Sequence, residues 1–313
     1  MVEKLYARDA YGKALVELGL QNPNIVVLDA DLSGSTRTAL FAKEFPERFF
    51  NFGVAEQNMM ATASGLASCG KIVFASTFAM FASGRAWDQV RNSICTNNFD
   101  VKIVATHGGI TVGPDGCSHH AIEDIALMRA IPANMTIVVP ADAPETREAI
   151  FAAVKTKGPM YIRLGRPKVT TIEGKSNFRI GKSYSLREGK DVAIIACGIM
   201  VEQALKASEF LEKEGIFARV INMHTIRPID EEIIIKASEE TKGIVVCEEH
   251  ILNGGLSSAV DDCLAQHAPT YVAKVGIRER FGQSGEVEEL LEEYCLTAAH
   301  IVKATKAVLN KPR

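Results

Sequence analysis

The segment from His107 to His120 concentrates side chains that can exchange protons. It reads His-Gly-Gly-Ile-Thr-Val-Gly-Pro-Asp-Gly-Cys-Ser-His-His, so it holds three of the chain's seven histidines together with Asp115. Histidine titrates near neutral pH and can donate, accept or relay a proton. A solvated surface loop or an adventitious metal site is the alternative, but packing seldom needs so many titratable groups on one loop. The segment therefore predicts a catalytic or ligand-binding loop.

A single glutamate, Glu56, stands in an unusually apolar setting. It follows Phe49-Phe-Asn-Phe-Gly-Val-Ala and precedes a helix-like run of small residues, so it falls in the first turn of that helix. A carboxylate there complements the helix dipole, which needs no further function. The apolar neighbours, however, would keep the carboxyl dry and favour its protonated form. Such a carboxyl can donate a hydrogen bond to a ring nitrogen.

Two further segments carry candidate ligand contacts. Phe78 and Phe81 are three residues apart, so on a helical turn they share one face and can clasp a flat ring. Aromatic residues at this spacing are also typical of a protein core. Asp31, in the segment Asp-Ala-Asp-Leu-Ser-Gly-Ser directly after Ile25–Leu28, fits an N-capped turn equally well.

Short β-branched runs alternate with longer amphipathic stretches along the chain, a pattern that predicts βαβ units with parallel sheets covered on both faces. The expected strands are Ile25–Leu28, Ile72–Phe74, Val101–Ala105, Thr136–Val139, Met160–Leu164, Val192–Ala196, Ala218–Asn222, Gly243–Cys247 and Val272–Val275. The expected helices are Arg8–Leu18, Ala55–Ala67, Arg85–Ile94, Pro144–Lys155, Val201–Glu214 and Ser257–Gln266. The glycine-rich loop then follows the strand Val101–Ala105, which is where α/β folds place ligands.

This alternation breaks once, in a stretch rich in Lys, Ser, Thr and Gly. We expect a first α/β domain over residues 1–167, a linker with one strand at most over 168–187, and a second α/β domain over 188–313. Each domain should have three layers around a mainly parallel sheet. This is the predicted fold class.

Composition excludes several classes of function for this 313-residue chain. The formal net charge is −3 and no basic run occurs, which argues against nucleic acid or an anionic membrane as partner. Seven scattered cysteines without a C-x-x-C spacing argue against structural zinc and a disulfide framework. The start is charged and amphipathic, unlike a signal peptide, and no apolar run has the length of a membrane span. We therefore expect a soluble cytoplasmic protein without metal ligands of its own.

Taken together and in this order, the motifs resemble the C-terminal half of transketolase, a thiamine-diphosphate enzyme, over nearly the whole chain. The loop from His107 to His119 keeps the family's spacing of His, Gly-Gly, Asp-Gly and His. Glu56 lies in the family's Gly-x-x-Glu-Gln/His context, and Ser-Thr-Phe78-x-x-Phe81 matches its pyrimidine-stacking segment. The resemblance implies a pyrimidine-binding domain followed by the transketolase C-terminal domain.

The resemblance also assigns roles to individual residues. Glu56 matches the glutamate that hydrogen-bonds N1′ of the aminopyrimidine and so promotes loss of the thiazolium C2 proton. The implied cofactor contacts are Glu56, Phe78, Phe81 and Asp31. The implied groups around the substrate phosphate are Arg8, Ser35, His107 and Arg163. His107 and His119 are the implied catalytic histidines, and Asp115 and His119 would hold sugar hydroxyls and assist proton transfer.

His120 receives no role. A third aromatic of the family's pyrimidine pocket is Gly84 here, for which Trp87 could compensate from the next helical turn.

The family's Mg²⁺ and diphosphate motif, Gly-Asp-Gly followed by Asn-Asn, does not occur in this chain. By resemblance the chain is thus the small subunit of a split transketolase, a transferase of the pentose phosphate pathway. It would move a two-carbon ketol unit from a ketose phosphate to an aldose phosphate. A partner, the N-terminal transketolase subunit, would carry the Mg²⁺ and diphosphate site, in a dimer or α2β2 heterotetramer.

Three other interpretations stay open from the sequence. The 2-oxoacid dehydrogenase E1 β subunit has a similar length, although its substrate carries no sugar phosphate. Deoxyxylulose-phosphate synthase shares sugar-phosphate recognition and is harder to separate. A non-catalytic subunit that kept the fold would gain little from a dry carboxyl at Glu56. In the second domain, Glu248-Glu249-His250 and the glycines after them predict a loop with solvated charges, and that domain is expected to support assembly.

Overall fold

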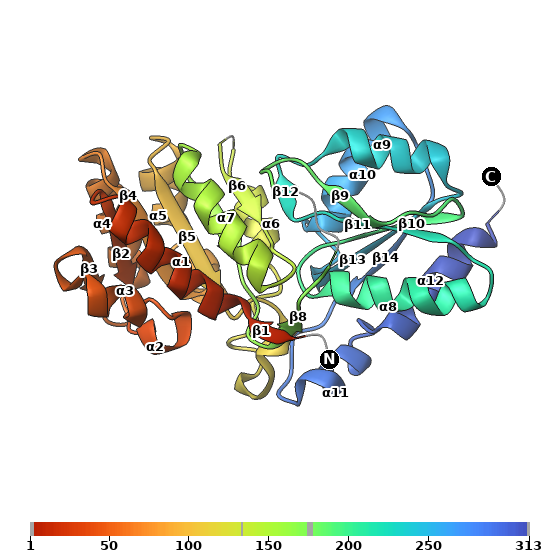
Figure 1. The fold of residues 1–313 in the computed structure, drawn as a ribbon, viewed down its shortest axis with the longest axis horizontal. Helices are drawn as coiled ribbons and strands as arrows, with labels where there is room; N and C mark the ends of the chain where they lie inside the picture. The colour runs from red at the N-terminus through yellow and green to blue at the C-terminus, as the bar shows by residue number, and fades with distance from the viewer. Residues whose placement is uncertain (1–2, 133, 174–177, 312–313) are drawn as a thin grey trace.

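The computed structural model describes residues 3–132, 134–173 and 178–311. Within this part of the chain, two sheets lie side by side, each covered by helices on both faces (Figure 1). The seven-stranded sheet has the order β12-β6-β7-β5-β4-β2-β3, and the five-stranded sheet has the order β14-β13-β10-β11-β9. Within these two sheets, neighbouring strands are parallel except where β12 pairs with β6 and β9 pairs with β11. Strands β1 and β8 form a separate two-stranded antiparallel sheet. The predicted α/β class with mainly parallel sheets is confirmed.

Each of the nine strands expected from the apolar runs overlaps a strand of the structure. The strands are β1 Lys4–Tyr6, β2 Ile25–Asp29, β3 Phe49–Asn51, β4 Ile72–Phe78, β5 Val101–Thr106, β6 Thr136–Val138, β7 Met160–Arg163, β8 Lys168–Thr170, β9 Tyr184–Arg187, β10 Val192–Ala196, β11 Ala218–Asn222, β12 Thr225–Arg227, β13 Ile244–Ile251 and β14 Val272–Ile277. The α-helices are α1 Ala7–Gln21, α2 Ser33–Thr36, α3 Ala39–Glu44, α4 Glu56–Ser68, α5 Trp87–Gln89, α6 Asp124–Arg129, α7 Ala143–Lys155, α8 Met200–Lys213, α9 Glu231–Glu240, α10 Leu256–His267, α11 Val287–Glu293 and α12 Ala298–Leu309. Two 3-10 turns, η1 Pro46–Arg48 and η4 Ile110–Asp115, and two π-helical turns, η2 Phe81–Arg85 and η3 Val90–Cys95, complete them.

Strand β2 shows why the apolar runs are continuous rather than alternating. All five of its residues are buried. Ile25 and Val27 pack with α1 and α7, whereas Val26 and Leu28 pack on the other face with α4. Because successive side chains point to opposite faces, a strand covered by helices on both sides must be apolar at every position.

The two α/β units share contacts that the expected domain division does not show. Strand β12 follows β11 of the second sheet in sequence, yet it pairs with β6 at the edge of the first. One hydrophobic cluster includes Ile137 of β6 and Met223, next to β11. The expected linker, 168–187, contains β8, which pairs with β1, and β9, which joins the second sheet. Its residues 174–177 lie outside the described part.

The predicted helix over Arg85–Ile94 has a different form from the one expected. It consists of π-helical turns η2 and η3 on either side of the short α5. Phe78 ends β4 and Phe81 begins η2, so the two rings meet at a strand-to-helix junction and not on one helical turn. Across the described residues, no helix combines the length and the apolar character needed to cross a membrane.

Candidate active site

The candidate site lies where the neighbouring parallel strands β2, β4 and β5 end. Strand β4 pairs with both of the others, so their carboxyl ends meet at one edge of the sheet. Asp31 follows β2, Phe78 closes β4, and His107 follows β5. Ligands of open α/β sheets bind at such an edge. Three segments far apart in the sequence thus reach the same place.

Glu56 begins α4, and its side chain is only 1% exposed. The guanidinium of Arg85 donates a hydrogen bond from Nη1 to Glu56 Oε2 at 2.9 Å. The same guanidinium lies over the ring of Phe81, 4.5 Å from its centroid. The carboxyl is thus buried, as its apolar neighbours suggested, and it also has a cationic partner; its protonated form stays a prediction. Arg85, which lies 29 residues further along the chain, was not predicted as a site residue.

The two phenylalanines form an aromatic cluster with two histidines of the glycine-rich loop. The rings of Phe78 and Phe81 are nearly parallel, at 18°, with centroids 6.1 Å apart. His107 stacks on Phe78 at 3.9 Å, and the ring of His119 meets Phe81 edge-on at 5.3 Å. The structure thus brings together all four of these predicted residues.

His107 occupies a buried position with positive φ, +59°, directly at the end of β5. Its Nδ1 lies 2.9 Å from the hydroxyl of Thr106. Burial lowers the pKa of His107, the charges of Arg8 and Arg166 act in the same direction, and the combined effect brings the pKa to about 3. The imidazole is therefore neutral at physiological pH, with one donor and one acceptor nitrogen.

A basic pocket of about 450 Å³ lies near His107, whose pKa is lowered by the charges of two of the pocket's lining residues, Arg8 and Arg166. Its lining residues are Lys4, Tyr6, Arg8, Thr111, Arg166, Pro167, Lys168, Val287 and Glu288. Burial lowers the pKa of Arg8, and nearby Arg37 adds to this effect. Arg8 also donates to the backbone oxygen of Ser35 at 3.3 Å, which places that predicted residue beside the pocket. Four cationic side chains against one carboxylate suit a small anion.

Arg163, predicted to contact a substrate phosphate, has a different environment. Its side chain is buried, and Nε donates to Asp124 at 2.8 Å. Its Nη2 donates to the backbone oxygens of Ala121 and Glu249, both at 3.0 Å. Burial alone lowers the pKa of Arg163, but Asp124 and Glu249 outweigh it and raise the pKa above its ordinary value. The Arg163 guanidinium is thus occupied by partners inside the protein, and Arg163 does not line the basic pocket. Arg166, three residues later, lines the pocket in its place.

The glycine-rich loop is held from the second α/β unit. Its residue Thr111 donates its backbone N–H to the Glu249 carboxylate at 2.7 Å. Gly109 has φ +90°, and a Cβ there would lie 2.1 Å from the Glu249 carboxyl carbon. His120, which had no predicted role, is buried against Gly282 and contacts the backbone oxygen of Gly113 at 3.0 Å. The loop therefore depends on both sheets.

The loop after β2 is organised by Asp29, which was not predicted to contribute. Its buried carboxylate accepts hydrogen bonds from the backbone N–H of Leu32 at 2.6 Å and from the hydroxyls of Thr36 and Thr38. Burial raises the pKa of Asp29, although these hydrogen bonds oppose the shift. Asp31, with φ +66°, is fixed by two hydrogen bonds with Asn51, at 3.0 and 3.1 Å.

Trp87, Asp115 and His119 are the remaining residues that the sequence singled out. Trp87 donates its indole N–H to the backbone oxygen of Leu127 at 2.9 Å and packs on the core, so its ring does not replace the aromatic missing at Gly84. Asp115 is exposed at the end of η4, and His119 is half-buried. Both lie on the loop as predicted, but no contact joins Asp115 to the aromatic cluster among the described residues.

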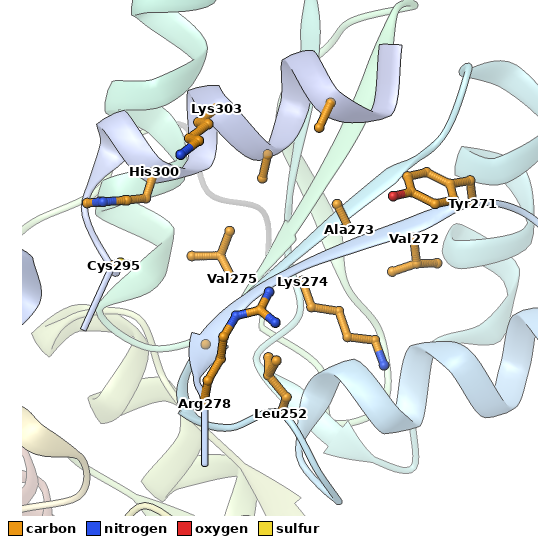
Figure 2. Close-up of a pocket in the computed structure, with 13 residues that line it drawn as sticks. Leu252, Tyr271, Val272, Ala273, Lys274, Val275, Arg278, Cys295, His300 and Lys303 are labelled. Carbon is orange, nitrogen blue, oxygen red and sulfur yellow. The ribbon is translucent and has the colours of Figure 1, made fainter. Parts of the chain in front are cut away.

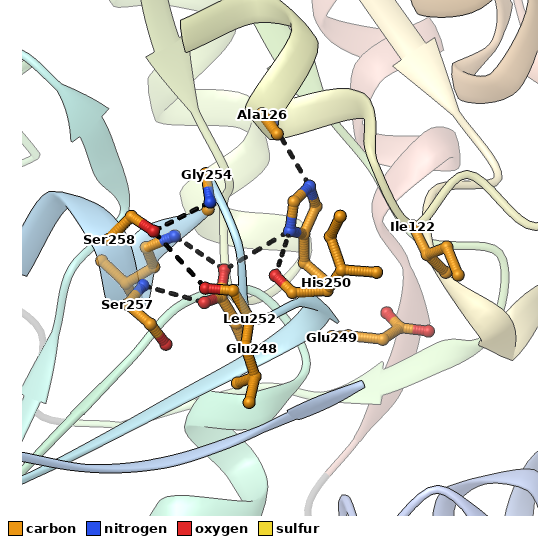
Figure 3. Close-up of polar contacts among 12 residues, drawn as sticks. Ile122, Ala126, Glu248, Glu249, His250, Leu252, Gly254, Ser257 and Ser258 are labelled. Carbon is orange, nitrogen blue, oxygen red and sulfur yellow. Dashed lines mark hydrogen bonds and ion pairs between the residues drawn. The ribbon is translucent and has the colours of Figure 1, made fainter. Parts of the chain in front are cut away.

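Glu248, Glu249 and His250 are buried, which contradicts the expected loop with solvated charges (Figure 3). Glu248 accepts the backbone N–H groups of Leu256 and Ser257, at 2.6 and 2.8 Å, and so caps the start of α10. His250 accepts the backbone N–H of Ala126 at 3.3 Å. His250 and Glu249 thus fasten β13 to the first unit, whereas Glu248 acts within the second.

A second cavity, of about 500 Å³, lies between β14 and α12 (Figure 2). Lys274, Arg278 and Lys303 line it, and Lys274 pairs with Asp261. It contains none of the predicted site residues. In the described part of the chain, no group of three or more His, Cys, Asp or Glu side chains is placed to hold a metal ion.

Two family models match this chain. One, transketolase, pyrimidine binding domain, covers residues 3–171, and the other, transketolase, C-terminal domain, covers residues 181–301. The chain belongs to the transketolase family. The strand edge that carries Glu56, the phenylalanines and the glycine-rich loop lies in the part matched by the first model.

Relatives of two lengths match the chain. A protein of Methanocaldococcus jannaschii named as a transketolase C-terminal section is 50% identical, covering 97% of this chain and 96% of that protein. The 6-deoxy-6-sulfo-D-fructose transketolase subunit of Clostridium sp. (strain MSTE9) is 40% identical, with 99% and 96% covered. Transketolase of Homo sapiens is 35% identical, and the match covers 99% of this chain but 50% of that longer protein.

The solved structures that match the chain also include both a split and a full-length transketolase. A split-gene transketolase described as an inactive β4 tetramer matches with a TM-score of 0.92 and 52% identity, covering 99% of this chain and 100% of that one. Transketolase of Pichia stipitis in complex with sedoheptulose 7-phosphate matches with a TM-score of 0.85 and 26% identity, covering 98% and 46%. The chain thus spans about half of the full-length transketolases and nearly all of the split ones. It is a transferase subunit of this family.

Proposed function

We propose that the chain is the small subunit of a split, thiamine-diphosphate-dependent transketolase that moves a two-carbon ketol unit between sugar phosphates. The observation that carries this proposal is the continuity of the site. The buried Glu56 carboxylate, the Phe78 and Phe81 rings and the histidines lie near a basic pocket whose charges act on His107. A cofactor ring and a substrate phosphate therefore find suitable surfaces next to each other.

The residues present fit the pyrimidine end of the cofactor. Glu56 offers a carboxylate whose partner, Arg85, is half-exposed and can be displaced, and two near-parallel aromatic rings stand beside it. In the proposal, Glu56 hydrogen-bonds the ring nitrogen N1′, Phe78 and Phe81 pack on the ring, and Asp31 lies near the thiazolium. Bound thiamine diphosphate supplies the carbon nucleophile that carries the two-carbon unit. The proposal assigns the Mg²⁺ ligands and the diphosphate contacts to the partner subunit.

For the substrate, the proposal assigns the phosphate to Arg8, Arg166, His107 and Ser35. Guanidinium groups suit bidentate phosphate recognition, and a neutral imidazole can donate one hydrogen bond without adding charge. His119 and Asp115 would contact the sugar hydroxyls, with His119 moving a proton at the carbon–carbon bond that breaks. Arg163 has no direct role in this version of the site.

Exposed apolar residues next to Glu56 support a partner at this surface. Phe50 and Val54 are 43% and 73% exposed, and both precede Glu56 by only a few residues. Such exposure near a site suits burial in a subunit interface. We propose that the N-terminal transketolase subunit covers them in an assembly with at least two copies of each chain. Light scattering of the mixture should show that assembly. The unpaired state of all seven cysteines suits the cytoplasm, which the proposal includes.

Reconstitution tests the function directly. The chain is mixed with the subunit encoded for the N-terminal half, thiamine diphosphate and Mg²⁺, and ketol transfer from xylulose 5-phosphate to ribose 5-phosphate is measured. We expect transfer with wild type and a loss of about 100-fold or more with Glu56→Gln, since the amide cannot share a proton with N1′. Decarboxylation of pyruvate without ketol transfer would instead favour a synthase-like or E1-like enzyme. No reaction with either substrate would contradict the proposal.

A further inference from the structure

Arg85 makes two contacts that the proposed function reserves for the cofactor ring. Its guanidinium donates to Glu56 Oε2 at 2.9 Å, and it lies over the Phe81 ring at 4.5 Å from the centroid. Under the proposed function, a pyrimidine nitrogen would contact that carboxylate and the pyrimidine face would pack on that ring. A single side chain of the same subunit thus meets the carboxylate and the aromatic surface together.

The guanidinium of Arg85 and an aminopyrimidine ring share the features that allow one to replace the other. A guanidinium is a planar N–C–N system with N–H donors that stacks on aromatic faces. An aminopyrimidine is likewise planar and presents nitrogen atoms along its edge. We propose that Arg85 is an internal latch, which occupies the pyrimidine position in the free subunit and must leave when the cofactor binds. This inference rests on the proposed function.

Burial and exposure give the latch its two states. Glu56 is 1% exposed, and a carboxylate so deeply buried needs a partner to remain charged. Arg85 is 45% exposed, so its guanidinium can move into solvent without opening the core. Its backbone is fixed meanwhile, because Gln57 Nε2 donates to the Arg85 backbone oxygen at 3.1 Å. The side chain can therefore swing while the helical turn η2 stays in place.

The cofactor can bind only to molecules in which the latch is open. Its apparent affinity is therefore the intrinsic affinity multiplied by the fraction of molecules with an open latch. A partly exposed ion pair combined with a cation–π contact is expected to keep roughly 80–90% of molecules closed. Removing the latch should then tighten cofactor binding by about five- to tenfold. If Arg85 instead supported Glu56 in the cofactor-bound enzyme, removing it would weaken cofactor binding.

The test is calorimetric binding of thiamine diphosphate, with Mg²⁺, to the reconstituted complex. Arg85→Met removes the positive charge and the planar guanidinium group but keeps an apolar side chain on Phe81. The matched control is Arg147→Met, because Arg147 makes the same kinds of contact, an ion pair with Glu17 at 2.5 Å and a cation–π contact with Phe151 at 4.4 Å, on α7. We expect tighter binding for Arg85→Met and unchanged binding for Arg147→Met.

Each other result has a definite meaning. Unchanged or weaker binding by Arg85→Met, with normal binding by wild type, would overturn the latch and leave the proposed function standing. No binding by any of the three complexes would overturn both. If Arg85→Met does not fold, Arg85→Lys serves instead, since it keeps the charge beside Glu56 but loses the plane, and about two- to threefold tighter binding is expected. Unchanged or weaker binding by that variant would equally overturn the latch.

Discussion

Two arginines three residues apart have unrelated roles, and only their surroundings distinguish them. Arg163 ends β7 inside the protein, paired with Asp124 and hydrogen-bonded to two backbone oxygens. Arg166 lies beyond the strand, donates to the backbone oxygen of Val112 at 2.6 Å and lines the basic pocket. No property of the segment Arg-Leu-Gly-Arg predicts this difference, because the partners of Arg163 lie about 40 and 86 residues away. For the same reason the sequence alone offered no ground for choosing Arg166, the residue that lines the pocket, over Arg163.

Arg166→Ala should raise KM for phosphorylated substrates, because it removes a charge-assisted hydrogen bond of about 1.5–3 kcal/mol, equivalent to roughly ten- to a hundredfold. Arg163→Ala should instead lower the free energy of unfolding by about 3–5 kcal/mol, since it leaves Asp124 and Glu249 buried without their partner. Steady-state kinetics of the reconstituted enzyme and urea denaturation of the free chain separate the two effects. A stable Arg163→Ala chain with a selective rise in KM would restore the first assignment.

The low pKa of His107 makes the stability of the chain depend on pH. Its folded pKa of about 3 lies below the ordinary value of 6.5, so the unfolded chain takes up this proton first as the pH falls. The stability is thus fully present above pH 6.5 and is lost as the pH falls from there toward 3. Between pH 7.5 and pH 5 the loss from this one group should be about 2 kcal/mol.

Urea denaturation at pH 7.5 and pH 5 checks this prediction. His107→Asn cannot titrate in this range, so the difference between the two pH values should shrink by about 2 kcal/mol relative to wild type. An equal difference in both proteins would show that His107 titrates normally in the folded chain.

At the scale of elements, the glycine-rich loop connects the two α/β units. Its residue Gly109 leaves room for the Glu249 carboxylate, which comes from β13 of the second sheet and binds the backbone of Thr111. Through this contact the second unit holds the loop that carries His107 and His119. Loops that position functional groups are commonly held by such buried hydrogen bonds.

Gly109→Ala should therefore disturb both stability and activity. Gly70 provides a matched control, because its φ of +83° is similar but a Cβ there meets nothing within 4 Å. Gly70→Ala should show only the backbone strain, about 1–3 kcal/mol, with normal ketol transfer after reconstitution. Gly109→Ala should lower the free energy of unfolding by more than Gly70→Ala does, and it should also reduce turnover, since the Glu249 carboxylate must move. Equal losses of stability, with equal activity, would contradict the role of Glu249.

The strands of the sheets were the most predictable elements. Val192–Ala196 and Ala218–Asn222 match β10 and β11 at both ends, because buried parallel strands are continuous apolar runs. Strands β1, β8 and β12 have three residues each and pair with distant partners, so no local pattern indicates them. The same limit applies to the site. The loop and Glu56 stand out by composition, whereas Arg85 and Glu249 act only through contacts made after folding.

At the scale of the whole molecule, this chain provides one part of a site that a second polypeptide would complete. The surfaces proposed for a pyrimidine ring and a sugar phosphate lie on the first unit, which also carries the exposed Phe50 and Val54. The second unit fastens the loop through Glu249 and caps α10 through Glu248. A site divided between chains makes the activity depend on assembly, because neither subunit alone would hold both ends of the cofactor.

Calorimetry of thiamine diphosphate binding tests this division most directly. The cofactor is titrated, with Mg²⁺ present, into the chain alone, into the N-terminal subunit alone and into their mixture. We expect weak binding or none by this chain, because the diphosphate and Mg²⁺ contacts are assigned to the partner, and tight Mg²⁺-dependent binding by the mixture. Micromolar, Mg²⁺-dependent binding by this chain alone would contradict the account.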